Sequence, residues 1–243
     1  MKTLLMCFCC SIVLAANAQT TLNKTYPLKQ GDKIELDFDY PKIVRISTWD
    51  KNEVSVTAHV SINDGENDTA FVLEGNTVEG VLAIRNRINN MDKLPRIYTV
   101  VNQDGKKTVF RSKEDFKAFT NANSGNRRMT SEGVDLQITI EIKIPVTAVA
   151  TNIKSTYGMV EMVNFNAPAN INATYGGIDA TVSEASTGKL QATTSYGQIY
   201  TNLDLKLTDK TEKDFFTSFT AEPGKGPTYI LKSTYGKIYI RRP

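Results

Sequence analysis

Two carboxylates stand at equivalent places in consecutive copies of a repeated phrase. Glu161 and Asp179 each lie four residues after the tyrosine of a Tyr-Gly pair. In neighbouring strands they would be about 4.8 Å apart, near the roughly 5 Å used by retaining glycosidases. Any stack of strands gives this spacing, however, and exposed acids lack the raised pKa that a general acid needs. We therefore interpret them as solvated acids, with a polysaccharide-active β-helix enzyme as the alternative.

Other catalytic residue types are scarce. His59 is the only histidine, and it alternates with apolar residues of one strand, so we expect it to face solvent. Cys7, Cys9 and Cys10 all lie in the apolar stretch that precedes Gln19. Zinc sites and histidine-based nucleophiles need more of these residues, and no phosphate-binding or nucleophile-elbow motif is present. The sequence predicts no enzyme, no metal and no cofactor.

A phrase ending in Tyr-Gly occurs four times in the C-terminal third. Its tyrosines are 18, 21 and 39 residues apart, which is typical of a solenoid repeat. The four Tyr-Gly pairs are Tyr157 and Gly158, Tyr175 and Gly176, Tyr196 and Gly197, and Tyr235 and Gly236.

The residues around each pair predict a strand, a glycine corner and a second strand. Apolar Ile153, Ile171 and Leu231 stand four residues before their tyrosines, and polar residues alternate with them. We expect the four glycines to turn the chain with φ above zero. The same parity places the tyrosines inside, as a core stack; the alternative is an exposed row of rings that stacks on sugars.

The whole pattern predicts an all-β, single-domain β-solenoid of the right-handed β-helix type. It would cover residues 19–243, with an insertion at about 85–133 and the Tyr-Gly repeats at about 150–243. Earlier strands are expected at 33–38, 43–47, 54–62, 81–84 and 136–144. The insertion should hold a hairpin (97–101 and 108–111) and a helix at 113–122 with Ser112 as its N-cap.

Three further expectations concern the C-terminal end of the repeat. Phe215 and Phe219 have the spacing of the apolar residue and the tyrosine in the repeats, which suggests one more, degenerate repeat unit (a rung of the stack). The polar residues 208–214 suggest a loop. Residues 238–240 should form the last strand of the stack. Arg241, Arg242 and Pro243 would blunt its open edge, as charges and proline do at sheet edges.

Residues 1–18 have the features of a secretory signal peptide. A short basic start precedes an apolar stretch and an Ala16-Asn17-Ala18 cleavage site. Without Lys2, 28 basic residues face 26 acidic ones, which argues against nucleic acid as a partner. No later apolar run could span a bilayer, so the sequence predicts secretion to the periplasm or cell surface without a transmembrane segment.

One surface is a candidate for ligand binding. Tyr200 and Tyr239 share the outward position of the two carboxylates, and Lys237 lies beside Tyr239. With one degenerate rung between them, the two rings would stand about 10 Å apart, at two strand spacings. That distance would suit alternate units of an extended glycan.

Residues 46–56 and the Tyr-Gly repeats resemble a family of exported bacterial proteins called "putative adhesin", common in Bacteroidota. The resemblance implies a β-helix-like shape and carries over no catalytic or ligand residues. This chain departs from the family at Met159, Gly177, Gln198 and Lys237, where Asp is common. We predict an exported, non-enzymatic binding or scaffolding module of the cell envelope, whose partner is a glycan or an envelope protein. The alternatives are the polysaccharide-active enzyme and a periplasmic partner in envelope signalling.

Overall fold

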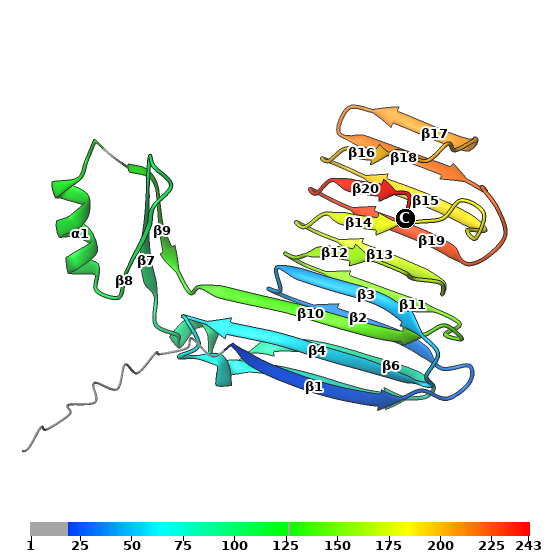
Figure 1. Ribbon diagram of the computed structural model, residues 1–243, viewed down its shortest axis with the longest axis horizontal. Coiled ribbons are helices and arrows are strands. Elements are labelled where there is room, and N and C mark those ends of the chain that lie inside the picture. The colour runs from blue at the N-terminus through cyan, green and yellow to red at the C-terminus, as the bar shows by residue number, and fades with distance from the viewer. Residues whose placement is uncertain (1–18, 126) are drawn as a thin grey trace, which may run out of the picture.

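The computed structural model describes residues 19–125 and 127–243, so the predicted signal peptide lies outside it. The described chain is mostly β, with two large sheets face to face. A smaller three-stranded sheet with a helix lies beside them within residues 97–133 and is here called the excursion (Figure 1). Sheet A has the order β1 (Thr20–Pro27), β4 (Glu53–Ile62), β10 (Leu136–Pro145), β3 (Ile43–Trp49), β12 (Met159–Met162), β14 (Ile178–Thr181), β20 (Ile238–Arg241), β16 (Ile199–Thr201). Sheet B has the order β17 (Leu207–Lys213), β18 (Phe216–Ala221), β15 (Lys189–Thr194), β19 (Thr228–Ser233), β13 (Ala169–Ala173), β11 (Thr151–Ser155), β2 (Lys33–Phe38), β6 (Val81–Ile88), β5 (Phe71–Val78).

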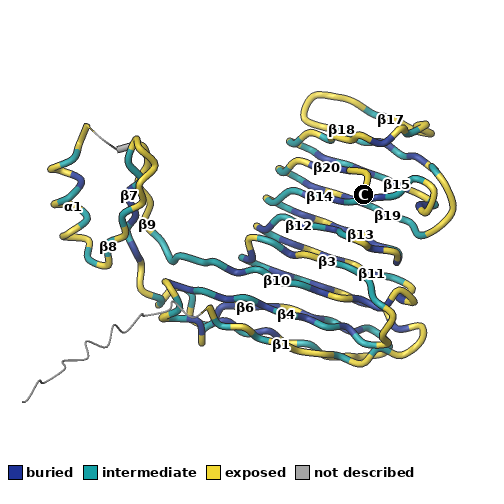
Figure 2. The backbone as a smooth tube through the Cα atoms, viewed as in Figure 1, coloured by how far each residue is buried: buried dark blue, intermediate teal, exposed yellow. Residues whose placement is uncertain are grey.

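The core lies between the two sheets, where strand alternation places the apolar side chains. In β4, Val54, Val56, Ala58 and Val60 are fully buried, while the residues between them are partly exposed. Figure 2 shows the same alternation of buried and partly exposed positions along the strands of both sheets. Period-two patterning therefore determines which face of each strand turns inward.

Five rungs each run from a strand of sheet B through a tight corner to a strand of sheet A. The rungs are β2–β3, β11–β12, β13–β14, β19–β20 and β15–β16, in spatial order. Neighbouring rungs pair in parallel, so that Ile153 lies beside Ile171 and Ile171 beside Leu231. This confirms the predicted unit of strand, corner and strand.

A closed solenoid is not what these strands form. Beyond the first rung, β10 still pairs in parallel with β3, and β6 with β2. The next pairings are antiparallel: β4 with β10 and with β1, and β5 with β6. Both sheets keep open edges, at β1 and β16 in one and at β17 and β5 in the other. The prediction of a solenoid of the β-helix type is thus confirmed only in its all-β class.

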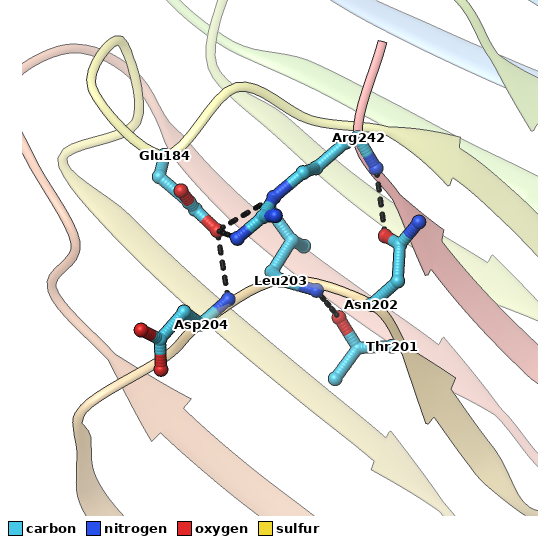
Figure 3. Close-up of polar contacts among 6 residues, drawn as sticks. All are labelled: Glu184, Thr201, Asn202, Leu203, Asp204 and Arg242. Atoms are coloured by element: carbon cyan, nitrogen blue, oxygen red, sulfur yellow. Dashed lines mark hydrogen bonds and ion pairs between the residues drawn. The ribbon is translucent and has the colours of Figure 1, made fainter.

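The order of the last two rungs differs from their order in the chain. The C-terminal strand β20 lies between β14 and β16, and β19 between β13 and β15. The prediction that residues 238–240 form an edge strand is therefore wrong. The tail is held beyond this strand: the Arg242 amide donates to Asn202 Oδ1 (2.9 Å) and its guanidinium to Glu184 Oε1 (3.0 Å; Figure 3).

At the far end of the stack, a hairpin replaces the predicted loop and degenerate rung. Residues 207–213 form strand β17, and β18 pairs antiparallel with both β17 and β15. Phe219 is buried as a core residue, but Phe215 sits in the hairpin turn. Both predictions for residues 208–219 are wrong, because this segment folds back on itself.

The excursion contains the predicted hairpin and helix. Strands β7 (Ile97–Asn102) and β8 (Lys107–Phe110) pair antiparallel, and β9 (Arg127–Gly133) joins β7 on its other side. Helix α1 (Lys113–Ala122) is capped by the Ser112 hydroxyl, which accepts from the Asp115 amide. Two short 3-10 turns, η1 (Asp68–Ala70) and η2 (Met91–Lys93), complete the described elements.

Candidate functional site

The corner glycines serve close approach between rungs. The described glycines with positive φ do not include Gly158, Gly176, Gly197 or Gly236, so the prediction of a φ above zero is wrong. A methyl group on any of the four would overlap a backbone carbonyl of the adjacent rung. Glycine is required because the backbones of neighbouring corners nearly touch.

The corners carry a continuous stack of aromatic rings, here called the tyrosine ladder. Successive ring centroids are 5.1 to 5.7 Å apart, and between neighbouring tyrosines the planes differ by 7 to 18°. In spatial order its members are Tyr40, Tyr157, Tyr175, Tyr235, Tyr196 and Phe215.

The ladder is a surface feature. Tyr157, Tyr175, Tyr196 and Tyr235 are 50 to 60% exposed, so the prediction that they form a core stack is wrong. Alternation fails there because the chain leaves sheet B before the tyrosine, at the buried Ser155 and its equivalents. The ring faces cover one another along the stack, while each of these four residues stays about half exposed.

Both ends of the ladder have an unusual backbone. Tyr40 has a φ of 71° and Phe215 a φ of 59°, a region that bulky residues rarely adopt. The sequence interpretation missed both as ladder members. Tyr40 could have been found, since Leu36 precedes it by the spacing that separates Ile153 from Tyr157, but no glycine follows it.

The predicted ligand residues do come together on the outer face of sheet A. The rings of Tyr200 and Tyr239 are stacked, with centroids 5.3 Å apart and planes 14° apart. The expectation that a degenerate rung separates the two rings is wrong, because β16 and β20 are direct neighbours. Lys237 Nζ lies 5.7 Å from the centroid of Tyr200, and the Arg241 guanidinium 5.2 Å from that of Tyr239.

The two candidate carboxylates are adjacent, as predicted, and each is held by an arginine. Glu161 pairs with Asp179 in register, and the two side chains are 23% and 25% exposed, so both are partly open to solvent. Arg45 lies 2.7 Å from Glu161, and Arg241 lies 2.8 Å from Asp179. The hydrogen bond to Glu161 raises the pKa of Arg45 further. Both carboxylates are therefore engaged in ion pairs.

The remaining candidates give no chemistry. His59 lies on the outer side of its strand, within 3.2 Å of the Thr21 hydroxyl. Over residues 19–125 and 127–243, no cluster of three or more His, Cys, Asp or Glu could hold a metal ion. Within the same ranges, no helix has the length and apolar character to cross a bilayer.

Comparison with known proteins finds similarity at the level of the fold. No protein-family model matches the chain, and no curated protein sequence does either. A crystal structure described as a putative cell adhesion protein from Clostridium sporogenes is similar, with a TM-score of 0.50 and 10% identity, over 93% of this chain and 100% of that chain. One described as a putative adhesin from Bacteroides fragilis has a TM-score of 0.26 and 11% identity, over 93% and 99%. The predicted resemblance to the putative adhesin family is thus confirmed as a likeness of fold, which the Clostridium structure shows.

Proposed function

We propose that this protein is an exported, non-enzymatic binding module of the cell envelope, an adhesin that holds an extended glycan on sheet A. One observation carries the proposal: Tyr200 and Tyr239 form a stacked pair on the outer face, flanked by Lys237 and Arg241. Aromatic rings bind the apolar faces of sugars, and cations beside them hydrogen-bond sugar hydroxyl and carboxylate groups.

The position of Tyr200 supports this role. Strand β16 is the edge strand of sheet A, so only β20 lies beside it in that sheet. One face of the Tyr200 ring is stacked on Tyr239, and the side chain is still 43% exposed. A sugar ring stacked there would continue the row of aromatic rings beyond the edge of the sheet.

A binding role also fits the state of the acids. Glu161 and Asp179 form ion pairs with Arg45 and Arg241, and Arg45 also pairs with Glu141, so the acidic pair that would favour a polysaccharide-cleaving enzyme is already engaged. The description of the similar Clostridium structure names adhesion and no reaction. These points favour binding over catalysis.

The same proposal includes the domain organisation and the location. Residues 1–18 would direct export to the periplasm or cell surface and be removed. Residues 19–243 would form one domain, in which the five rungs make a short solenoid-like segment and residues at about 85–133 are inserted. The flat outer face of the rungs would be the surface presented to the ligand.

A glycan array with the protein lacking residues 1–18 tests the proposal. The double variant Tyr200→Ala with Tyr239→Ala should lose binding to the glycans retained by the wild type and keep the same circular dichroism spectrum. Tyr98→Ala, which removes an aromatic contact with Phe116 in the excursion, is the matched control and should bind normally. Undiminished binding by the double variant, or depolymerisation of a bound polysaccharide, would contradict the proposal.

A further inference from the structure

Lysines without an acidic partner flank the tyrosine ladder. Lys232 stands three residues before Tyr235, and Lys237 two residues after it, so they lie on opposite sides of the same corner. Both are exposed, and neither is among the ion pairs of the described residues. Lys42, at the first corner, contacts only the neutral amide oxygen of Gln137 among its described side-chain partners.

The acids beside the central rungs of the ladder are held in ion pairs, whereas Asp39, beside Tyr40, and Asp214, beside Phe215, are in none of the ion pairs of the described residues. Asp37 lies 3.3 Å from Lys154, on the sheet B side of the first two corners. On the sheet A side, Glu161 and Asp179 pair with Arg45 and Arg241. Unpaired positive charge therefore gathers at the Tyr235 corner, at Lys232 and Lys237, while an acid stands at each end of the ladder.

We propose that the tyrosine ladder is the docking ridge for an acidic linear polysaccharide, which lies along the stack with about one sugar unit per rung. This rests on the proposed function for the ligand class, a glycan, and it adds the charge of that glycan and a second surface. Lys237 lies between the ladder and the Tyr200–Tyr239 pair, so the two surfaces are contiguous.

The exposed chemistry of the ladder suits hydrogen bonding along a polymer. Tyr157, Tyr175 and Tyr235 repeat at 5.2 Å, and each of the three residues is about half exposed. An extended chain of sugar rings advances by a similar length per unit, about one strand spacing. In the described residues, the Tyr229 hydroxyl donates to the Phe165 carbonyl (2.6 Å), whereas no hydrogen bond occupies these three hydroxyls.

The two ends of the ladder share a left-handed backbone, which at Phe215 belongs to the turn of the β17–β18 hairpin. A left-handed backbone at a non-glycine residue costs roughly 1 to 3 kcal/mol and is found preferentially at functional sites. Here it occurs at Tyr40 and at Phe215, the two residues that lengthen the ladder beyond the four Tyr-Gly rungs. Phe215 is 74% exposed, so burial of its ring does not repay the strain.

Affinity measurements with defined polymers test the inference. The probes are polygalacturonate, alginate, hyaluronate and heparin, with methyl-esterified polygalacturonate as the uncharged match and a DNA oligonucleotide as a non-glycan polyanion. The triple variant Tyr157→Phe, Tyr175→Phe, Tyr235→Phe keeps the rings and removes the hydroxyls. Lys232→Gln removes one charge on the side away from Tyr200 and Tyr239.

The inference expects at least one acidic polysaccharide to bind, with affinity falling as salt rises, and at least about tenfold less binding to its uncharged match. The triple variant should bind about tenfold or more weakly, since each lost hydrogen bond contributes about 1 kcal/mol, and Lys232→Gln should also weaken binding. Equal binding of DNA, normal binding by the triple variant, or no acidic polysaccharide bound would overturn it. If the triple variant still binds but the double variant Tyr200→Ala with Tyr239→Ala does not, the ladder is not the docking surface and the proposed function stands. If both variants bind as the wild type does, neither the ladder nor the Tyr200–Tyr239 pair is the binding site.

Discussion

Replacing Gly176 by alanine should destabilise the protein through its effect on the adjacent corner. A methyl carbon at this position would overlap the carbonyl group of Gly158 and come within 3.0 Å of the Met159 nitrogen. Both neighbours are backbone atoms, so no side chain can move aside. The two rungs would have to separate at their corner.

The expected loss is about 2 to 4 kcal/mol. Forcing an extra carbon into a packed site costs roughly 1 to 3 kcal/mol. Separation of the rungs would also stretch the bonds from the Thr174 amide to the Ser155 carbonyl (2.9 Å) and from the Tyr175 amide to the Thr156 carbonyl (2.8 Å), each contributing about 1 kcal/mol. The lower entropy of an unfolded chain with alanine offsets roughly 0.4 to 1 kcal/mol of this total.

Urea unfolding followed by far-UV circular dichroism measures the effect, which should lower the midpoint by about 1 M at an ordinary m-value. Gly133→Ala is the matched control, because a methyl group there meets nothing within 4 Å, and its midpoint should be unchanged or slightly higher. Gly176→Asn adds a second comparison, because asparagine would be tolerated if glycine were needed only for a left-handed backbone. If close approach of the neighbouring backbone is the reason, asparagine should destabilise the protein as alanine does. Equal midpoints for Gly176→Ala and Gly133→Ala would refute the close-approach explanation.

Three further predictions concern Tyr229, Tyr175 and the C-terminal tail. Burial raises the pKa of Tyr229 to about 12, above the ordinary unfolded value near 10. The stability that this group contributes should therefore be intact below pH 10 and fall by about 2 kcal/mol as the pH rises toward 12. Tyr229→Phe should remove this part of the alkaline transition in urea titrations at different pH values. Tyr175→Ala should lower the free energy of unfolding by only about 1 to 2 kcal/mol, since a half-exposed ring loses two stacking contacts. The control variant Tyr175→Phe should unfold like the wild type. A loss above about 4 kcal/mol for the alanine variant would mean that the ring is buried. The hydrogen bond from Arg242 lowers the pKa of Glu184, so the stability that this pair contributes is present above the unfolded pKa of Glu184 and lost as the pH falls through the lower folded value. Arg242→Ala should flatten that acid dependence of stability. Deletion of residues 241–243 should leave light scattering unchanged, because β20 is an interior strand.

Local patterns determined the units of this fold. Period-two alternation in residues 54–62 and around each Tyr-Gly pair depends only on near neighbours in the chain, so these strands and their inward faces could be predicted. The hairpin at the start of the excursion and the Ser112-capped helix are local for the same reason. The outward position shared by Glu161, Asp179, Tyr200 and Tyr239 also followed from parity.

The order of the rungs and the roles of the corner residues were decided by tertiary structure. Tyr200 and Tyr239 are far apart in the sequence, yet their rings stack at 5.3 Å because β20 lies between β14 and β16. Which strand pairs with which is a long-range choice made by packing, and each rung alone carries nearly the same pattern. Parity is undefined at a corner, so only the folded chain showed that the tyrosines are exposed and that the glycines serve close backbone contact. The partners of Glu161 and Asp179 were hidden for the same physical reason: Arg45 is brought to Glu161 by pairing between strands distant in sequence, a contact that no local pattern records.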